Sequence, residues 1–319
     1  MTSLMQIKQE ITELKNKHNA LILAHFYEDG EIQDIADYCG DSLFLAQKGQ
    51  ESSHPVVLMA GVVFMGEGIK LLSPEKTVLV PDMNAGCSLV NHSPYDDYKA
   101  WRDSFIDPVV VTYINSSTEV KSVSDVICTS SNAEKIIASI PENRTVLFGP
   151  DRNLGAYLSK KLNRKMELWP GACEVHVLFS AKKIVELKVE HPDALVLAHP
   201  ECLESVLQFA DIIGSTSHLI NTVKESSASK FIIATEPGVI HQMRKHRPDA
   251  LLLEAPAEGS CACNECPYMK LNTLEKIRDA LMNLSPQIHL NADHAEKARN
   301  ALEKMMTISR GQDVSWNLV

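Results

Sequence analysis

The chain has 319 residues, of which 45% are hydrophobic and 23% are charged, and it carries a formal net charge of −10. A chain of this length forms about two domains, or three small ones, and its composition is ordinary for a globular protein. It holds no apolar run near the ~18 residues of a membrane span, no secretory signal, and no basic run suited to nucleic acid or an anionic membrane. We therefore expect a cytoplasmic protein whose ligand is a small phosphorylated or carboxylated metabolite.

The chain opens with an amphipathic helix, and a strand then ends in a polar cluster. Residues 20–27 read ALILAHFY, an apolar run that stops at His25. Two later runs, VVVTYINS and ALVLAHPE, stop in the same way at Tyr113 and His199, after intervals of 88 and 86 residues. Continuous apolar runs of this kind are typical of strands that are covered on both faces. The pattern predicts three equivalent buried strands with polar residues at their carboxyl ends.

Each of these runs is followed by a helix-length segment and then by a cluster of small polar residues. The clusters contain Ser42, Ser130 and Ser215, at intervals of 88 and 85 residues. A further apolar run comes next in each case, PVVLMAGVVF, TVLFGPDRNL or KFIIATEPGV, and it opens a new helical stretch. Strands that alternate with helices indicate parallel sheets with right-handed crossovers.

A short strand and a cysteine close each segment, at Cys87, Cys173 and Cys266. The chain therefore predicts an α/β fold of three similar small parallel-sheet domains, related by pseudo-threefold symmetry around a central active site. The recurrence of three landmarks at nearly constant spacing disfavours chance similarity among strands. We place the three domains at residues 1–92, 93–178 and 179–290, and a C-terminal helix that packs back on the body within 291–319. The helical stretches of this last region are predicted over residues 271–283 and 292–308.

Eight cysteines occur, three of them in the six residues CACNEC. A reducing cytosol keeps thiols free, and clustered cysteines in a cytosolic enzyme indicate metal binding or catalysis. Ligands of open α/β sheets bind at the carboxyl ends of strands, so one cysteine from each unit can reach a common centre. Three thiolates can bind zinc together with a fourth ligand, or three irons of a [4Fe–4S] cluster whose fourth iron then acts as a Lewis acid. The isolated Cys39, Cys128 and Cys202 are expected to be small buried hydrophobic residues.

Other reactive side chains stand at the same strand ends. The candidates for proton transfer are His25, Tyr27, His199 and Glu201. Tyr113 and Asn115 offer hydrogen bonds to a carboxylate or an enolate. The candidates for binding a phosphate or carboxylate at the start of a helix are Ser42, Ser130, Ser215 and Thr216. Each type also has a plainer explanation, since a serine before a helix is usually an N-cap and a strand-end histidine is usually structural.

The motifs along residues 20–275 resemble, in order, those of the quinolinate synthase family of de novo NAD biosynthesis. They are AHFY, EIQDIADYCGDSL, PDMNAGC, VTYINSS, CTSSNA, GPDRNLG, WPGACEVH, AHPEC, GSTS, ATEPGV and CNECPYMKLN. The resemblance implies three similar α/β domains around a central site. It also implies a [4Fe–4S] cluster held by Cys87, Cys173 and Cys266, with one iron open to substrate.

The same resemblance implies an activity and roles for the strand-end residues. The activity is the condensation of iminoaspartate with dihydroxyacetone phosphate to quinolinate, with loss of phosphate and two waters. The acid–base set is His25, Tyr27, His199 and Glu201, of which all but Tyr27 also bind substrate. Tyr113 and Asn115 bind a substrate carboxylate or the intermediate, and the anion-binding hydroxyls are those of Ser42, Ser130, Ser215 and Thr216. Because iminoaspartate is unstable in water, we expect functional coupling to an aspartate-oxidising enzyme; no nucleic acid or membrane partner is expected.

Some alternatives stay open at this point. Many family members space the three cysteines of the last motif by two residues each, whereas this chain has Cys261, Cys263 and Cys266. Cys263 is therefore an alternative ligand, and a Cys263–Cys266 disulfide would remove one. Two other functions compete, another [4Fe–4S] hydro-lyase and a metal-binding sensor protein with a structural site such as zinc. A structural site is more often closed by four ligands, so ligands spread over three units favour catalysis.

Overall fold

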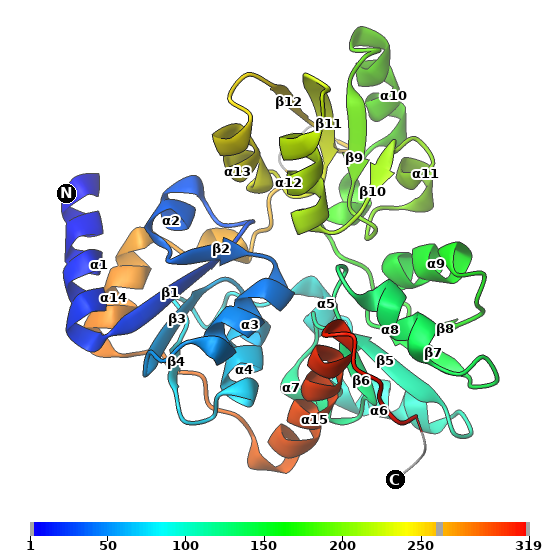
Figure 1. Cartoon of the computed structure of the whole chain (residues 1–319), viewed down its shortest axis with the longest axis horizontal. Helices are drawn as coiled ribbons and strands as arrows, with labels where there is room; N and C mark the ends of the chain where they lie inside the picture. Colours follow the sequence, from blue (N-terminus) through cyan, green and yellow to red (C-terminus); the bar gives the residue numbers. More distant parts are fainter. Residues whose placement is uncertain (1–2, 260–263, 317–319) are drawn as a thin grey trace.

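The computed structural model of the protein describes residues 3–259 and 264–316. The chain forms three lobes around a common centre (Figure 1). The elements of the first lobe are, in chain order, α1 (Leu4–His18), β1 (Ala20–His25), α2 (Gly30–Ile35), β2 (Tyr38–Gly40), α3 (Ser42–Glu51), β3 (Val56–Ala60), α4 (Val63–Leu72), β4 (Thr77–Leu79) and α5 (Ser88–Asn91).

The other two lobes repeat this alternation of strands and helices. The elements of the second lobe are α6 (Tyr95–Asp103), β5 (Val109–Tyr113), α7 (Thr118–Ser122), β6 (Val126–Cys128), α8 (Ala133–Ser139), β7 (Val146–Gly149), α9 (Arg152–Lys161), β8 (Glu167–Leu168) and the 3₁₀ turn η1 (His176–Leu178). Those of the third lobe are α10 (Ala181–Glu190), β9 (Leu195–Ala198), α11 (Glu204–Leu207), β10 (Ile212–Ile213), α12 (Thr216–Glu225), β11 (Lys230–Ala234), α13 (Val239–His246) and β12 (Leu251–Glu254). The 3₁₀ turn η2 (Met269–Leu271) and the helices α14 (Leu274–Asn283) and α15 (Ala292–Ser309) complete the chain.

The three sheets share one strand order. They read β2-β1-β3-β4, β6-β5-β7-β8 and β10-β9-β11-β12, and every strand pair within them is parallel. The first strand of each unit is therefore central and has covered faces, as its continuous apolar sequence predicts. The predicted α/β class with three similar parallel sheets is confirmed.

Each sheet has one strand that the sequence pattern did not predict. These edge strands, β2, β6 and β10, have only two or three residues, which is too short to show a period. An aspartate precedes each of them, and its hydrogen bond to the neighbouring strand explains why they form. The side chains of Asp37, Asp125 and Asp211 accept the backbone N–H groups of Ile22, Val110 and Val196, at 2.9, 2.7 and 2.8 Å. Each contact ties the edge segment to the central strand beside it.

The last two helices pack on the first two lobes. Helix α14 lies against α1 (Figure 1), and its Leu274 and Ile277 share a hydrophobic cluster with Ile7 and Ile11. Helix α15 contacts α7, α8 and β6 of the second lobe and also α4 of the first. The division of the chain at residues 92, 178 and 290 stays a proposal. It assigns α14 to the third unit, although α14 packs against α1 of the first lobe.

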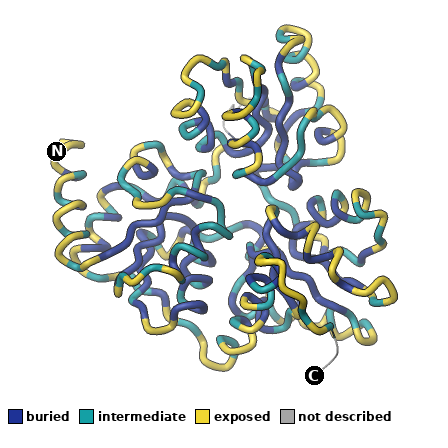
Figure 2. Tube along the Cα trace, in the orientation of Figure 1, coloured by how far each residue is buried: buried dark blue, intermediate teal, exposed yellow. Residues whose placement is uncertain are grey.

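Burial differs between the lobes. One hydrophobic cluster extends from the first sheet to the second, joining residues such as Met59 and Phe148, whereas the third lobe encloses separate clusters around Val196 and Phe231. Figure 2 shows the buried strands at the middle of each lobe. The third lobe therefore meets the others mainly where the strand ends converge. Within residues 3–259 and 264–316, none of the helices combines the length and apolarity needed to cross a bilayer.

Candidate active site

A cavity lies where the three lobes meet, at the carboxyl ends of the central strands. It contains about 730 Å³ of space not filled by atoms, part of it open to solvent, and its walls come from all three lobes. Twelve of the thirteen predicted site residues line it: His25, Tyr27, Ser42, Cys87, Tyr113, Asn115, Ser130, Cys173, His199, Glu201, Thr216 and Cys266. Side chains up to 241 positions apart in the chain are thus brought to one place.

Ser215 is the predicted site residue that does not line this cavity. Its hydroxyl accepts the backbone N–H of His218 at 3.3 Å, so it is the N-cap of α12. Thr216 is the first residue of α12, and Ser42 is the first residue of α3, whose N-cap is Asp41. Ser215 is therefore an N-cap, the plainer explanation given above. Ser42 and Thr216, which stand next to the caps, line the cavity.

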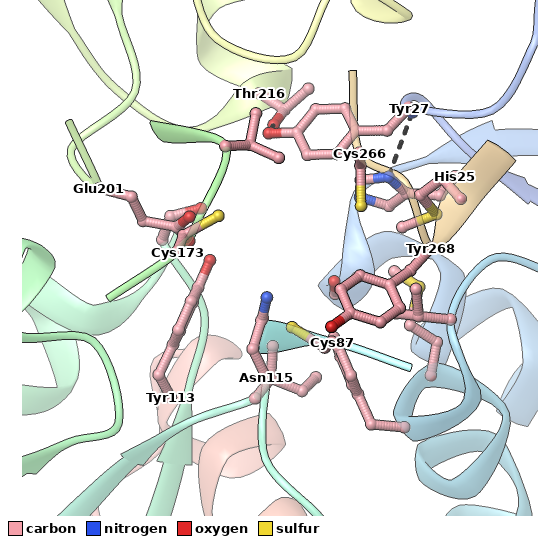
Figure 3. A pocket seen from close by; sticks show the side chains of 18 of the residues that line it. His25, Tyr27, Cys87, Tyr113, Asn115, Cys173, Glu201, Thr216, Cys266 and Tyr268 are labelled. Carbon is pink, nitrogen blue, oxygen red and sulfur yellow. Dashed lines mark hydrogen bonds between the residues drawn. The ribbon is translucent and has the colours of Figure 1, made fainter. Parts of the chain in front are cut away.

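The three cysteines surround one space from three directions (Figure 3). Each is followed by a short helical element: Cys87 stands directly before α5, and Cys173 and Cys266 stand three residues before η1 and η2. Backbone N–H groups two or three residues further on donate hydrogen bonds toward each sulfur. Such donors stabilise a thiolate, the form of cysteine that binds metals. The same local arrangement thus occurs once in each lobe.

Burial controls the protonation of these thiols. It raises the pKa of Cys87 to about 12 and that of Cys266 to about 11, and it raises the pKa of Cys173 well above its ordinary value. Without a bound cation the three groups are therefore neutral thiols at neutral pH. Binding a metal ion displaces the protons, and the hydrogen-bond donors then support the thiolates.

The spacing of the thiols tests which metal they fit. Among the described residues, the group whose ligand atoms all lie within 4.8 Å of one another is Cys173, His176 and Glu201, a candidate metal-binding group. Cys87 and Cys266 are not part of such a group. Two thiolates on one tetrahedral zinc, with bonds of ~2.3 Å, would lie only about 3.8 Å apart. Within the described residues, the three cysteines therefore do not lie as the ligands of a single zinc ion.

A repeated turn orients the two strand-end histidines. The backbone N–H of Tyr27 donates to Nδ1 of His25 at 3.2 Å, and that of Glu201 donates to Nδ1 of His199 at 3.4 Å. Because Nδ1 accepts in both rings, Nε2 carries the proton of the neutral imidazole. Burial lowers the pKa of His25 to about 4 and that of His199 to about 3. Both rings are therefore neutral at neutral pH.

A chain of hydrogen bonds connects Tyr27 to Glu201 across the cavity wall. The Tyr27 hydroxyl lies 3.0 Å from Oγ1 of Thr216 and 3.1 Å from Oγ1 of Thr235. Oγ1 of Thr235 lies 3.0 Å from Nε2 of His176, and Nδ1 of His176 lies 2.9 Å from a carboxylate oxygen of Glu201. Residues from all three lobes take part, so the chain forms only in the assembled fold.

The two ends of this chain have opposite tendencies to hold a proton. Burial raises the pKa of Glu201, but the imidazoles of His199 and His176 and a hydrogen bond from Tyr113 outweigh it, so the pKa lies below its ordinary value. Burial and the charge of Glu201 raise the pKa of Tyr27 well above its ordinary value. At neutral pH the site thus presents a carboxylate that can accept a proton and a phenol that can donate one.

Two members of this chain of hydrogen bonds, His176 and Thr235, were not predicted from the sequence. His176 follows Cys173 by three residues and is the first residue of η1. Its Nδ1 is 3.3 Å from the sulfur of Cys173. Thr235 directly follows β11, the strand-end position that singled out the other candidates. Both signals are present in the sequence, but only distances between lobes show that the two residues touch.

The remaining cysteines divide into two groups. Cys128 and Cys202 are fully buried in hydrophobic clusters, as predicted for isolated cysteines, and Cys39 is half-buried. Cys261 and Cys263 lie outside the described residues, so Cys263 as a ligand and the Cys263–Cys266 disulfide stay untested.

Fold and site together define a class of protein: an α/β enzyme of three parallel sheets with a candidate metal-binding group in its central cavity. The family model described as "Quinolinate synthetase A protein" matches residues 9–307, and the chain belongs to this family. The motif resemblance is thereby confirmed.

Curated relatives match along nearly their whole length. A protein of Microcystis aeruginosa named quinolinate synthase is 50% identical over 299 residues, which cover 94% of each chain. Quinolinate synthases of Prochlorococcus marinus (strain MIT 9313) and Gloeothece citriformis are 47% and 50% identical over 310 and 300 residues. These matches cover 97% and 94% of this chain and 93% of each relative.

Proposed function

We propose that this protein is a quinolinate synthase that condenses iminoaspartate with dihydroxyacetone phosphate, forming quinolinate and releasing one phosphate and two waters. The reaction would take place on a [4Fe–4S] cluster held by Cys87, Cys173 and Cys266. The observation that carries this proposal is the convergence of three thiols, one from each lobe, beside an acid–base set in one cavity. The names of the relatives support the same reaction.

The donor set suits such a cluster. Three separated cysteines, each with its own hydrogen-bond donors, leave a fourth iron without a protein thiolate. When bound, the cluster supplies a Lewis acid that can hold a hydroxyl or carboxylate oxygen of the substrate. Every other step below depends on side chains of this chain.

Proton transfer is assigned to Glu201 and Tyr27. Glu201 is a carboxylate at neutral pH and can take a proton from the reacting carbon or nitrogen. Tyr27 is a phenol and can give a proton to the oxygen that leaves as water. Thr235 and His176 connect the two by hydrogen bonds, so a proton taken at Glu201 can return Tyr27 to its protonated form.

Binding and orientation are assigned to the neutral donors around them. Four neutral hydrogen-bond donors line the cavity: the Nε2–H groups of His25 and His199, the hydroxyl of Tyr113 and the amide of Asn115. They can bind substrate carboxylates without adding charge. The hydroxyl of Tyr113 also bonds to Glu201. These residues would hold the condensation product while water is eliminated.

The phosphate is assigned to the starts of helices. Ser42 and Thr216 open α3 and α12, and Ser130 lies shortly before α8. Helix N-termini and their free N–H groups attract anions. The hydroxyl of Ser215 caps α12, and Ser215 does not line the cavity, so the anion-binding role is assigned to its neighbour Thr216.

Two further expectations belong with this function. Iminoaspartate is short-lived in water, so an aspartate-oxidising enzyme is the functional partner that we propose. A cluster with thiolate ligands requires reduced cysteines, which supports the cytoplasm as the compartment.

The test uses the full chain, reconstituted with iron and sulfide without oxygen. We expect a brown protein with absorbance near ~400 nm and about four irons per chain, which forms quinolinate from dihydroxyacetone phosphate and iminoaspartate made in situ. Cys87→Ser should lose both the colour and the activity. Cys39→Ser is the matched control, because Cys39 is half-buried and lies outside the cavity, and it should keep both.

Two results would contradict the proposal. A colourless protein that binds one zinc ion per chain would support the metal-binding sensor instead. A brown protein that forms no quinolinate but dehydrates another hydroxy acid would support a different hydro-lyase.

A further inference from the structure

Two buried carboxylates occupy matching places in the second and third lobes. Asp151 stands two residues after the end of β7, and Glu236 stands two residues after the end of β11. Both side chains are fully buried. A buried carboxylate is costly unless hydrogen bonds compensate it, so its partners show what it does. The matching residue after β3 is the apolar Val62.

Each carboxylate uses its two oxygens to join a strand end to a cysteine. One oxygen of Asp151 accepts the N–H of Leu154 at 2.8 Å, and the other accepts the N–H of Cys173 at 3.1 Å. One oxygen of Glu236 accepts the N–H of Gly238 at 2.7 Å, and the other accepts the N–H of Cys266 at 3.4 Å. The cysteine backbone is thereby tied to the end of the third strand of its own lobe.

Backbone contacts provide a similar tie in the first two lobes. The N–H of Val63 donates to the carbonyl of Ala85 at 2.7 Å, and the N–H of Arg152 donates to the carbonyl of Gly171 at 2.8 Å. Both carbonyls stand two residues before a cysteine of the site. The residue that matches Val63 and Arg152 in the third lobe is Pro237, which has no N–H to donate.

The donors explain why a carboxyl group fits these two positions better than an amide. Both oxygens of each side chain face N–H groups, and an amide would turn one of them into a second donor. A side chain that caps a helix can stay exposed to solvent, so the helix start does not explain why Asp151 and Glu236 are buried. Their hydrogen bonds to the cysteine backbone do.

We propose that Asp151 and Glu236 are positioning residues that hold Cys173 and Cys266 in the geometry of the metal centre. This inference rests on the proposed function in one respect, that these cysteines bind the cluster. Glu236 carries the larger share, because Pro237 leaves the third lobe without the backbone tie that Arg152 makes in the second.

The experiment compares Glu236→Gln and Asp151→Asn with the wild type, all as full-length reconstituted protein. The readout is the rate at which an excess of chelator removes iron, followed at ~400 nm. Loss of a group that orients a metal ligand typically weakens metal binding by about 10- to 100-fold. We expect iron loss to be about 10-fold faster or more in Glu236→Gln, and a smaller acceleration in Asp151→Asn. Rates within twofold of the wild type in both variants would overturn the proposal.

The matched controls are Asp211→Asn and Asp125→Asn. These carboxylates also accept backbone N–H groups, from Val196 and Val110, but they stand before the edge strands, at the opposite ends of the sheets from the cavity. They should release iron at the wild-type rate. Equal acceleration in controls and test variants would show a general loss of stability and overturn the positioning role.

A second measurement works without metal and separates this proposal from the proposed function. In the metal-free chain, alkylation of each cysteine is followed by mass spectrometry. Glu236→Gln should speed the reaction of Cys266 and leave Cys87 unchanged. If the wild type takes up no cluster, the proposed function fails, and unchanged alkylation of Cys266 would then separately overturn the positioning role.

Folding of the variants is checked by circular dichroism. Lys270 has its Nζ 3.7 Å from Glu236 and makes a closer contact to Asp29, at 2.7 Å, that does not involve Glu236. If Glu236→Gln does not fold, Glu236→Asp tests the same tie, because it keeps the carboxyl group and shortens the reach. Iron loss at the wild-type rate in Glu236→Asp would then count against the proposal.

Discussion

At the scale of single residues, burial decides which groups carry charge. His25 and His199 are strand-end imidazoles whose sequence suggests acid–base chemistry, yet burial keeps them neutral at neutral pH. Glu201 stays charged, because imidazoles and a phenol surround it. The residue types were predictable from the sequence. Their protonation was not, because it depends on the groups that the other lobes place around them.

Glu28 has no role in the proposed reaction, so the effect of burial on its pKa can be measured through stability alone. It is fully buried, and Nδ2 of Asn272 donates to one of its oxygens at 2.7 Å. Burial raises the pKa of Glu28 to about 8, from an ordinary value near 4.5. The folded state thus binds the proton more tightly than the unfolded state, so this group stabilises the fold at low pH. That contribution is lost as the pH rises from about 4.5 through about 8.

Glu28→Gln should therefore remove part of the pH dependence of stability. We expect the variant to exceed the wild type in free energy of unfolding by roughly 2–4 kcal/mol at pH 9, and to match it near pH 5. Urea unfolding at several pH values measures this difference. Glu190→Gln, at an exposed position of α10, is the control for a surface substitution and should change the free energy of unfolding by less than about 0.5 kcal/mol. An offset for Glu28→Gln that is the same at every pH would refute the assignment.

At the scale of elements, helices from the two ends of the chain complete the first lobe. The buried residues of α14 are Leu274, Ile277, Ala280 and Leu281. Intervals of three or four residues place side chains on one face of a helix. They cover the same hydrophobic cluster as α1. The helix itself was predictable from this spacing. Its place against the first lobe was not, because an apolar face does not specify its partner.

Ile277→Ala tests this packing. The side chain is fully buried, and such a truncation costs about 2–5 kcal/mol through lost transfer energy and a residual cavity. Met282→Ala, on the same helix with 53% of the side chain exposed, should change the free energy of unfolding by less than about 0.5 kcal/mol. Urea unfolding followed by circular dichroism compares the two. Equal effects would show that α14 does not stabilise the first lobe.

At the scale of the whole molecule, polar contacts beside the cavity join all three lobes. One carboxylate oxygen of Asp41, in the first lobe, accepts the hydroxyl of Ser131 in the second at 2.9 Å. The same oxygen accepts the hydroxyl of Ser217 in the third at 2.6 Å. Asp41, Ser131 and Ser217 stand next to Ser42, Ser130 and Thr216, the residues that we propose bind the phosphate. The contact therefore holds the lobes together where the phosphate is proposed to bind.

The double variant Ser131→Ala, Ser217→Ala should loosen this junction without unfolding the lobes. Each lost hydrogen bond is worth about 0.5–1.5 kcal/mol, so amide hydrogen exchange in residues 41–45 and 215–219 should accelerate by about 2- to 10-fold or more. Ser227→Ala, an exposed residue of the third lobe, should leave the exchange unchanged. Wild-type exchange in the double variant would show that Asp41 does not join the lobes.

The sequence by itself determined the elements that depend on local pattern. Continuous apolar runs predicted the central strands, and recurring landmarks near Cys87, Cys173 and Cys266 predicted three similar units with reactive residues at strand ends. Only the tertiary structure decided the edge strands, the partner of α14, and the contacts of His176 and Thr235. The physical reason is range: a period or a strand end is encoded by neighbours in the chain. Burial, charge state and hydrogen bonds across the cavity depend on groups that only the packed lobes bring within a few ångströms.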